Sequence, residues 1–213
     1  MKKVFLIGDS IRMGYDKYVK EALSGVADVY YPDENCKFAV YVLRFAHEWK
    51  RKFEIPDDID LVHWNAGLWD ALELFGDAPL TSLDYYEEAI GRIYKRLRML
   101  FPKAKIIFAT STAVVEGKAK ELIRHNAIIE QYNARALKAL SGTDTIINDL
   151  YALTSKLPES YHSDATHYYT PEATELIGGR VLAHICRELE IEKTEVNIEN
   201  FEPEKYTSDN IGG

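Results

Sequence analysis

The chain has 213 residues, which is enough for one hydrophobic core and too few for two large ones. Its composition is 46% hydrophobic and 28% charged, which fits a soluble globular protein and excludes the disordered and collagen-like classes. The formal charge is −8, from 34 acidic and 26 basic residues. We therefore expect no basic surface for nucleic acid or for an anionic membrane.

The N-terminal segment and the number of cysteines are informative about the cellular compartment of the protein. Two lysines precede an apolar run at Val4–Ile7, but this run is too short for the core of an export signal. No stretch of the sequence approaches the length of an apolar membrane helix. Cys36 and Cys186 are too few for a disulfide framework, and free thiols suit a reducing compartment. We expect a cytoplasmic protein without a membrane partner, and leave open an export signal trimmed from the sequence.

Strand-like and helix-like segments alternate along the chain. Five short segments rich in β-branched and apolar residues predict strands: Lys3–Ile7, Val26–Tyr30, Leu61–Trp64, Ile106–Ala109 and Thr145–Ile147. Segments with helical spacing lie between and after them: Asp16–Leu23, Phe38–Lys52, Leu83–Leu100, Lys118–Leu140 and Pro171–Leu189. Thr81 is the predicted cap of the third helix. This order predicts a three-layer α/β/α fold of flavodoxin-like type, with a parallel sheet of about five strands.

One domain accounts for the periodic part of the sequence. No repeat, low-complexity tract or linker divides residues 1–190. Residues 191–213 are polar and acidic without helical or strand spacing, which predicts an extended or frayed C-terminal tail.

Polar residues follow the predicted strands, where ligands of open parallel sheets gather. Gly8-Asp9-Ser10 follows the first strand, and Asn65 follows the third. A serine hydroxyl becomes a nucleophile when a base accepts its proton, and His167 is a candidate base. Asp164 lies three residues before His167, so it can hold the far ring nitrogen of the imidazole. The sequence therefore predicts a Ser10, Asp164 and His167 triad.

These residues lie in two motifs that resemble those of the GDSL/SGNH hydrolase family. "IGDS" at residues 7–10 is similar to the family's first block, and "HSDATHYYTPEA" at residues 162–173 is similar to its last block. The resemblance covers about Val4 to Glu188. It implies the SGNH hydrolase fold, a serine esterase or acylhydrolase activity with Ser10 as nucleophile, and no metal or organic cofactor.

The middle blocks depart from the family pattern and suggest a divergent member. The family's second block supplies an oxyanion-hole glycine, whereas "YYPDENCKF" at residues 30–38 contains none, so Asn35 is the candidate there. The third block, usually Gly-x-Asn-Asp, reads "HWNAGLWD" at residues 63–70, which makes Asn65 the candidate side-chain donor. With the Ser10 backbone N–H, these residues form the predicted oxyanion hole.

Three residues are candidates for contact with the substrate. They are Asp9, Trp64 and Trp69, with the alternatives that Asp9 braces its loop and that the tryptophans belong to the core. We expect a small-molecule or carbohydrate ester with a short acyl group. A lysophospholipase or thioesterase is an alternative, as is a non-catalytic flavodoxin-like domain that binds a glycan. His162, Asp164 and His167 also allow a metal site, but no fourth ligand is apparent and Ser10 would have no role.

Overall fold

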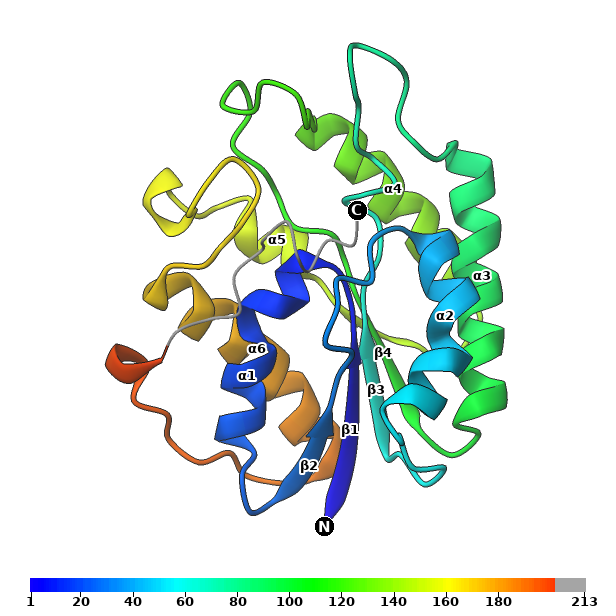
Figure 1. The fold of residues 1–213 in the computed structure, drawn as a ribbon, viewed down its shortest axis with the longest axis vertical. Helices are drawn as coiled ribbons and strands as arrows, with labels where there is room; N and C mark the ends of the chain where they lie inside the picture. Colours follow the sequence, from blue (N-terminus) through cyan, green and yellow to red (C-terminus); the bar gives the residue numbers. More distant parts are fainter. Residues whose placement is uncertain (202–213) are drawn as a thin grey trace.

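The sheet has five parallel strands in the order β2-β1-β3-β4-β5. In the computed structural model, which describes residues 1–201, the strands are β1 (Lys2–Ile7), β2 (Ala27–Tyr30), β3 (Leu61–Trp64), β4 (Lys105–Ala109) and β5 (Ile146–Asn148). The strands rise from the N-terminus at the bottom of Figure 1, so their carboxyl ends meet at the top. The predicted α/β architecture and all five predicted strands are confirmed.

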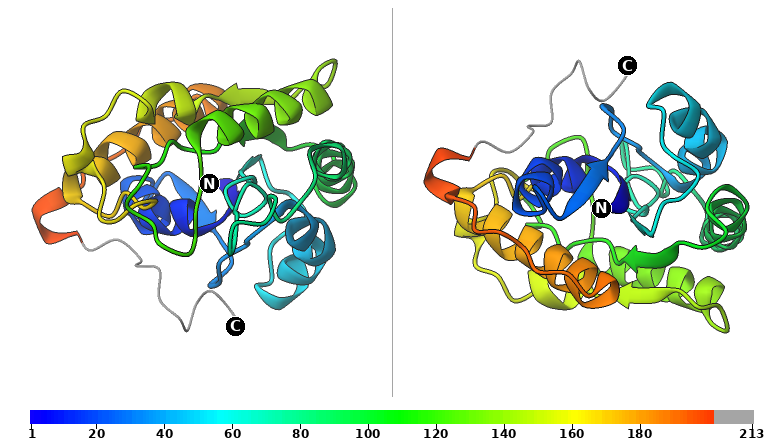
Figure 2. Two further views of the ribbon diagram at one scale, coloured as in Figure 1. Left: turned by 90° about the horizontal axis from the view of Figure 1, so that it is seen from above. Right: turned by 90° about the horizontal axis from the view of Figure 1, so that it is seen from below.

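Helices cover both faces of the sheet. They are α1 (Ser10–Ala22), α2 (Ala39–Lys52), α3 (Leu83–Leu100), α4 (Asn126–Leu140), α5 (Leu150–Thr154) and α6 (Pro171–Leu189), with short 3₁₀ helices η1 (Glu159–Tyr161) and η2 (Ile198–Asn200). In Figures 1 and 2, α1 and α6 lie together on one side of the sheet, and α2 and α3 on the other. The inner strand β1 is buried from Val4 to Ile7, because helices pack on both of its faces.

Two predicted helix starts were wrong. The first helix begins at Ser10, six residues before the predicted start, because Asp9 caps it directly at the end of β1. Residues 10–16 of this helix are all buried, so its polar residues do not mark a solvent-exposed turn. The fourth helix begins at Asn126 instead of Lys118, since the preceding segment pairs Ile123 with Glu73 in an isolated antiparallel bridge.

Two smaller differences concern helix ends and a short helix. The Ser82 hydroxyl, and not Thr81, accepts the N–H of Tyr85 at the start of α3. The five-residue helix α5 was not predicted. It is too short to show a helical repeat of apolar residues in the sequence.

The described part of the predicted tail packs on the domain. Thr194 donates its N–H to the Ala22 carbonyl at 2.7 Å, and the rings of Phe201 and Tyr18 meet edge to face. The remainder of the predicted tail, residues 202–213, lies outside the described residues. Among the helices of residues 1–201, none has the length and apolar composition needed to cross a membrane.

The N-terminus of α2 is capped by a carboxylate from a distant loop. Phe38, at the N-cap position, has no side-chain acceptor, and the Ala39 N–H instead donates to Asp70 Oδ2 at 3.0 Å. Asp70 is fully buried, and this burial raises its carboxyl pKa to about 7. A carboxyl group with a raised pKa holds its proton more tightly in the folded than in the unfolded chain.

Asp70 should therefore make folding stability depend on pH. Between about pH 4, where the unfolded chain releases this proton, and about pH 7, where the folded chain does, rising pH should weaken the wild type relative to Asp70→Asn. The expected slope is up to about 1.4 kcal/mol per pH unit, and the difference should level off above pH 7. Urea unfolding of both proteins between pH 4.5 and 8 measures it. Parallel stability curves would contradict the raised pKa.

Candidate active site

The turn after β1 places Ser10 at the carboxyl edge of the sheet. The Asp9 side chain accepts the N–H of Ile11 at 3.0 Å and so caps α1, which makes Ser10 the first residue of that helix. The first N–H groups of a helix have no partner within it and lie at the positive end of the helix dipole. The Ser10 N–H is therefore well suited to stabilise a developing negative charge.

Two hydrogen bonds connect Ser10 to His167 and His167 to Asp164. His167 Nε2 is 2.9 Å from Ser10 Oγ, and His167 Nδ1 is 2.7 Å from Asp164 Oδ2. The other carboxylate oxygen of Asp164 accepts the backbone N–H groups of Thr166 and His167 at 2.7 and 2.8 Å. The fold thus brings the three predicted residues together, although 157 positions separate Ser10 from His167.

The charge state of Asp164 defines the direction of these hydrogen bonds. Burial raises the pKa of the Asp164 carboxyl, but hydrogen bonds and charge from His167, with the two backbone N–H groups, outweigh burial and lower it overall. An ionised carboxylate can only accept, so His167 Nδ1 carries the proton and donates to it. In the neutral imidazole, Nε2 is then left as an acceptor for the Ser10 hydroxyl, which is the arrangement that general-base catalysis requires.

A pocket of about 490 Å³ opens beside Ser10 and His167. Its volume is in the range of small-molecule sites. The segment 118–122, which was predicted to be helical, forms much of its wall, together with Trp69, Arg124, Asp164, Ala165 and Thr166. The pocket therefore joins the carboxyl end of β1 to two loops that are distant in sequence.

Asn65 lies against the turn that carries Ser10. Its Nδ2 donates to Asp9 Oδ1 at 3.0 Å, and an added Cβ on Gly8 would lie only 2.0 Å from Asn65 Oδ1. Gly8 is therefore required by the close approach of the Asn65 side chain. An amide nitrogen carries two hydrogens, and Asp9 accepts one of them. Asn65 is not among the residues that line the pocket, so its predicted oxyanion role stays a prediction.

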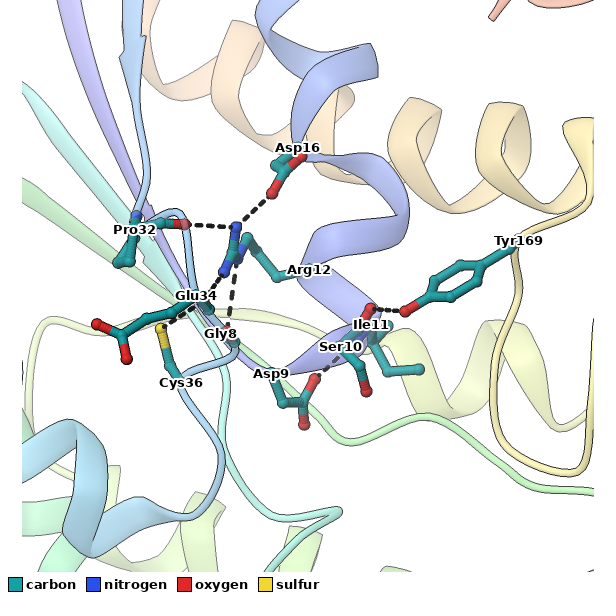
Figure 3. Close-up of polar contacts among 10 residues, drawn as sticks. All are labelled: Gly8, Asp9, Ser10, Ile11, Arg12, Asp16, Pro32, Glu34, Cys36 and Tyr169. Atoms are coloured by element: carbon teal, nitrogen blue, oxygen red, sulfur yellow. Dashed lines mark hydrogen bonds and ion pairs between the residues drawn. The ribbon is translucent and has the colours of Figure 1, made fainter. Parts of the chain in front are cut away.

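The loop that carries Asn35 is held against the same turn by Arg12. Figure 3 shows the buried Arg12 guanidinium paired with Asp16 and donating to the carbonyl oxygens of Pro32 and Glu34 at 3.0 and 2.5 Å. Asn35 is fully buried, and its Oδ1 accepts the N–H of Lys37. Asn35 is not among the residues that line the pocket, so its predicted oxyanion role stays a prediction.

The structure corrects two of the predicted substrate contacts. Trp64 is fully buried and packs edge to face on Phe108 in the core, so it cannot reach a substrate in the pocket. Asp9 is also fully buried, because it caps α1 and binds the Asn65 amide. Trp69 does line the pocket, and it remains a candidate for substrate contact.

Arg124 lines the pocket and was not identified from the sequence. Its Nε donates to the Leu68 carbonyl at 2.5 Å, and its Nη1 lies 3.5 Å from the Thr166 hydroxyl. Arg124 thus links the loop after β3 to the loop that carries His167, and its charge lowers the pKa of the buried Asp9 against the larger effect of burial. These partners are 56 and 42 residues away, so no local pattern marks Arg124.

Neither cysteine offers a rival nucleophile. Cys36 and Cys186 are both free, and burial raises the pKa of the Cys36 thiol to about 12, which keeps it protonated at neutral pH. Within residues 1–201, no three His, Cys, Asp or Glu side chains are grouped as metal ligands. The alternative hypothesis that His162, Asp164 and His167 bind a metal ion therefore has no support in the geometry of residues 1–201.

Comparisons with known proteins define the fold class. No family model and none of the curated proteins matches the chain. The solved structures similar to it include a lipase/acylhydrolase from Enterococcus faecalis, with 18% identity and a TM-score of 0.70 over 92% of this chain and all of that one. A GDSL-like lipase from Bacteroides thetaiotaomicron has 16% identity and a TM-score of 0.64 over 87% of this chain and 88% of that one.

An acetyl xylan esterase has 16% identity and a TM-score of 0.64 over 86% of this chain and 99% of that one. The chain therefore has the fold of the GDSL/SGNH hydrolases, which confirms the fold that the resemblance implied.

Proposed function

We propose that the chain is a serine esterase of the GDSL/SGNH type that cleaves O-acyl esters through an acyl-enzyme. The observation that carries this proposal is the linked set of Ser10, His167 and Asp164 beside a pocket of about 490 Å³. A binding domain without activity would not need a base 2.9 Å from a serine hydroxyl at a helix N-terminus.

The chemistry follows from the protonation states. Ser10 Oγ attacks the ester carbonyl carbon while His167 Nε2 accepts the hydroxyl proton. The negative oxygen of the tetrahedral intermediate is held by the Ser10 N–H and the second hydrogen of the Asn65 amide. His167 then donates its proton to the leaving alcohol, and a water activated by the same base releases the acid and regenerates Ser10.

Short acyl groups on a polar alcohol are the proposed substrates. The pocket wall carries the charged residues Lys118, Lys120, Glu121 and Arg124, which suit a hydroxyl-rich or otherwise polar alcohol part. Trp69 provides an aromatic surface on which a sugar ring could pack. The similarity of the fold to an acetyl xylan esterase agrees with an acetyl group on a carbohydrate.

Turnover of p-nitrophenyl esters by the wild type and Ser10→Ala tests the proposal. We expect the wild type to hydrolyse p-nitrophenyl acetate and the variant to lose this activity, with covalent labelling by an organophosphonate lost in parallel. A fall in kcat/KM from acetyl to palmitoyl esters is expected from a pocket of only about 490 Å³, whereas a rise would favour a lysophospholipase or thioesterase. Hydrolysis that persists in Ser10→Ala would contradict the proposed nucleophile.

A further inference from the structure

Tyr169 lies two residues after His167 and contacts both partners of the proposed proton transfer. Its hydroxyl donates to the Ser10 carbonyl oxygen at 2.7 Å, as Figure 3 shows. Its ring stacks on the His167 imidazole, with centroids 5.0 Å apart and planes at 25°. The chemistry described above uses neither contact.

The Tyr169 ring is also fitted against the helix that begins with Ser10. A Cβ added to Gly14 would lie 2.8 Å from the Cδ1 and Cε1 atoms of Tyr169. A larger residue at position 14 of α1 would therefore clash with the Tyr169 ring. Burial raises the pKa of the Tyr169 phenol, so the hydroxyl remains a neutral donor over the working pH range. The half-buried ring therefore packs between α1 and the loop of His167.

We propose that Tyr169 is a positioning residue that sets the distance and angle between His167 Nε2 and Ser10 Oγ. The inference rests on the proposed esterase function. His167 comes from a loop without regular structure, whereas Ser10 is part of a buried helix, so the proton transfer needs a rigid connection between the two. Tyr169 provides it, because its hydroxyl is bound to the backbone of Ser10 while its ring limits the rotation of the imidazole.

Tyr169→Phe and Tyr169→Leu separate the two contacts. The phenylalanine keeps the stacked ring and loses the hydrogen bond, and we expect kcat to fall about tenfold with KM nearly unchanged. The leucine loses both contacts, and we expect a fall of about 10²-fold. Tyr168→Phe is the matched control, because Tyr168 also donates to a backbone carbonyl, that of Ala113, at 2.8 Å.

Gly14→Ala perturbs the same contact from the side of the helix. The new methyl group would displace the Tyr169 ring, and we expect kcat to fall while the Ser10 side chain and the triad residues are unaltered. If this variant does not fold, Tyr169→Phe still tests the proposal, since it removes a single oxygen atom.

The measurement is kcat per active site, counted by organophosphonate titration of Ser10. A purely structural role of Tyr169 would lower the titrated fraction or the melting temperature and leave kcat per titrated site at the level of Tyr168→Phe, which would overturn the inference. A lower kcat per titrated site with nearly constant KM supports it. Absence of Ser10-dependent turnover and labelling in the wild type would instead overturn the proposed function, and this inference with it.

Discussion

Replacing His167 by alanine is expected to lower kcat for ester hydrolysis by about 10⁴- to 10⁶-fold. His167 Nε2, 2.9 Å from Ser10 Oγ, is the group positioned to accept the hydroxyl proton, and without it Ser10 is a poor nucleophile at neutral pH. KM should change little, because the imidazole acts on the reacting atoms. Steady-state kinetics with p-nitrophenyl acetate at several pH values measures the loss.

Companion variants identify the cause of that loss. Asp164→Asn keeps the shape of the side chain but removes the charge that holds His167 Nδ1 protonated, so a fall of up to about 10⁴-fold is expected. A His167→Ala/Ser10→Ala double variant should be no slower than either single variant, because the residues act as a unit. His162→Gln is the control from the same loop, since its ring packs on Tyr168. An additive double variant would argue against a shared proton transfer.

Replacing Asn65 by alanine is expected to lower kcat by about 10²- to 10³-fold. The Asn65 amide is held by its hydrogen bond to Asp9 and by its packing on Gly8, and we propose that its second hydrogen binds the oxyanion without reorganisation. The ester carbonyl of the bound substrate carries little charge, and KM should therefore stay close to the wild-type value.

Asn133→Ala is the matched control for Asn65→Ala. Asn133 is also a buried asparagine, and its side chain makes two hydrogen bonds to the backbone of Ser111. Both variants lose buried hydrogen bonds, so both should lower the free energy of unfolding. Equal kcat values for the two variants, normalised to titrated Ser10, would show that Asn65 supports the fold and not the reaction.

The sequence was most informative where one local rule decides the structure. The strand Leu61–Trp64 and the helices Leu83–Leu100 and Pro171–Leu189 have the bounds that apolar spacing and flanking residues predict. The start of α1 was placed wrongly, because Ser10 and Arg12 are polar yet buried, and they have hydrogen-bond partners in distant loops. The hydropathy of neighbouring residues contains no information about such partners.

Trp64 and Trp69 show the same limit within one motif. Both were predicted to contact the substrate because they lie near Asn65 in "HWNAGLWD". Trp64 belongs to β3 and is buried, whereas Trp69 lies in the following loop and lines the pocket. Arg124 and the 118–122 segment entered the site only with the structure, because their roles depend on contacts with residues that are remote in sequence.

The sequence by itself determined the parallel α/β fold and the identity of the three candidate catalytic residues, because hydrophobic periodicity and two short motifs are local properties of the chain. Only the tertiary structure decided the distances among Ser10, His167 and Asp164, the burial of Asp9 and Trp64, and the wall of the pocket. These quantities depend on how the carboxyl ends of β1 and β3 meet the loop before α6, and packing between distant segments sets that arrangement.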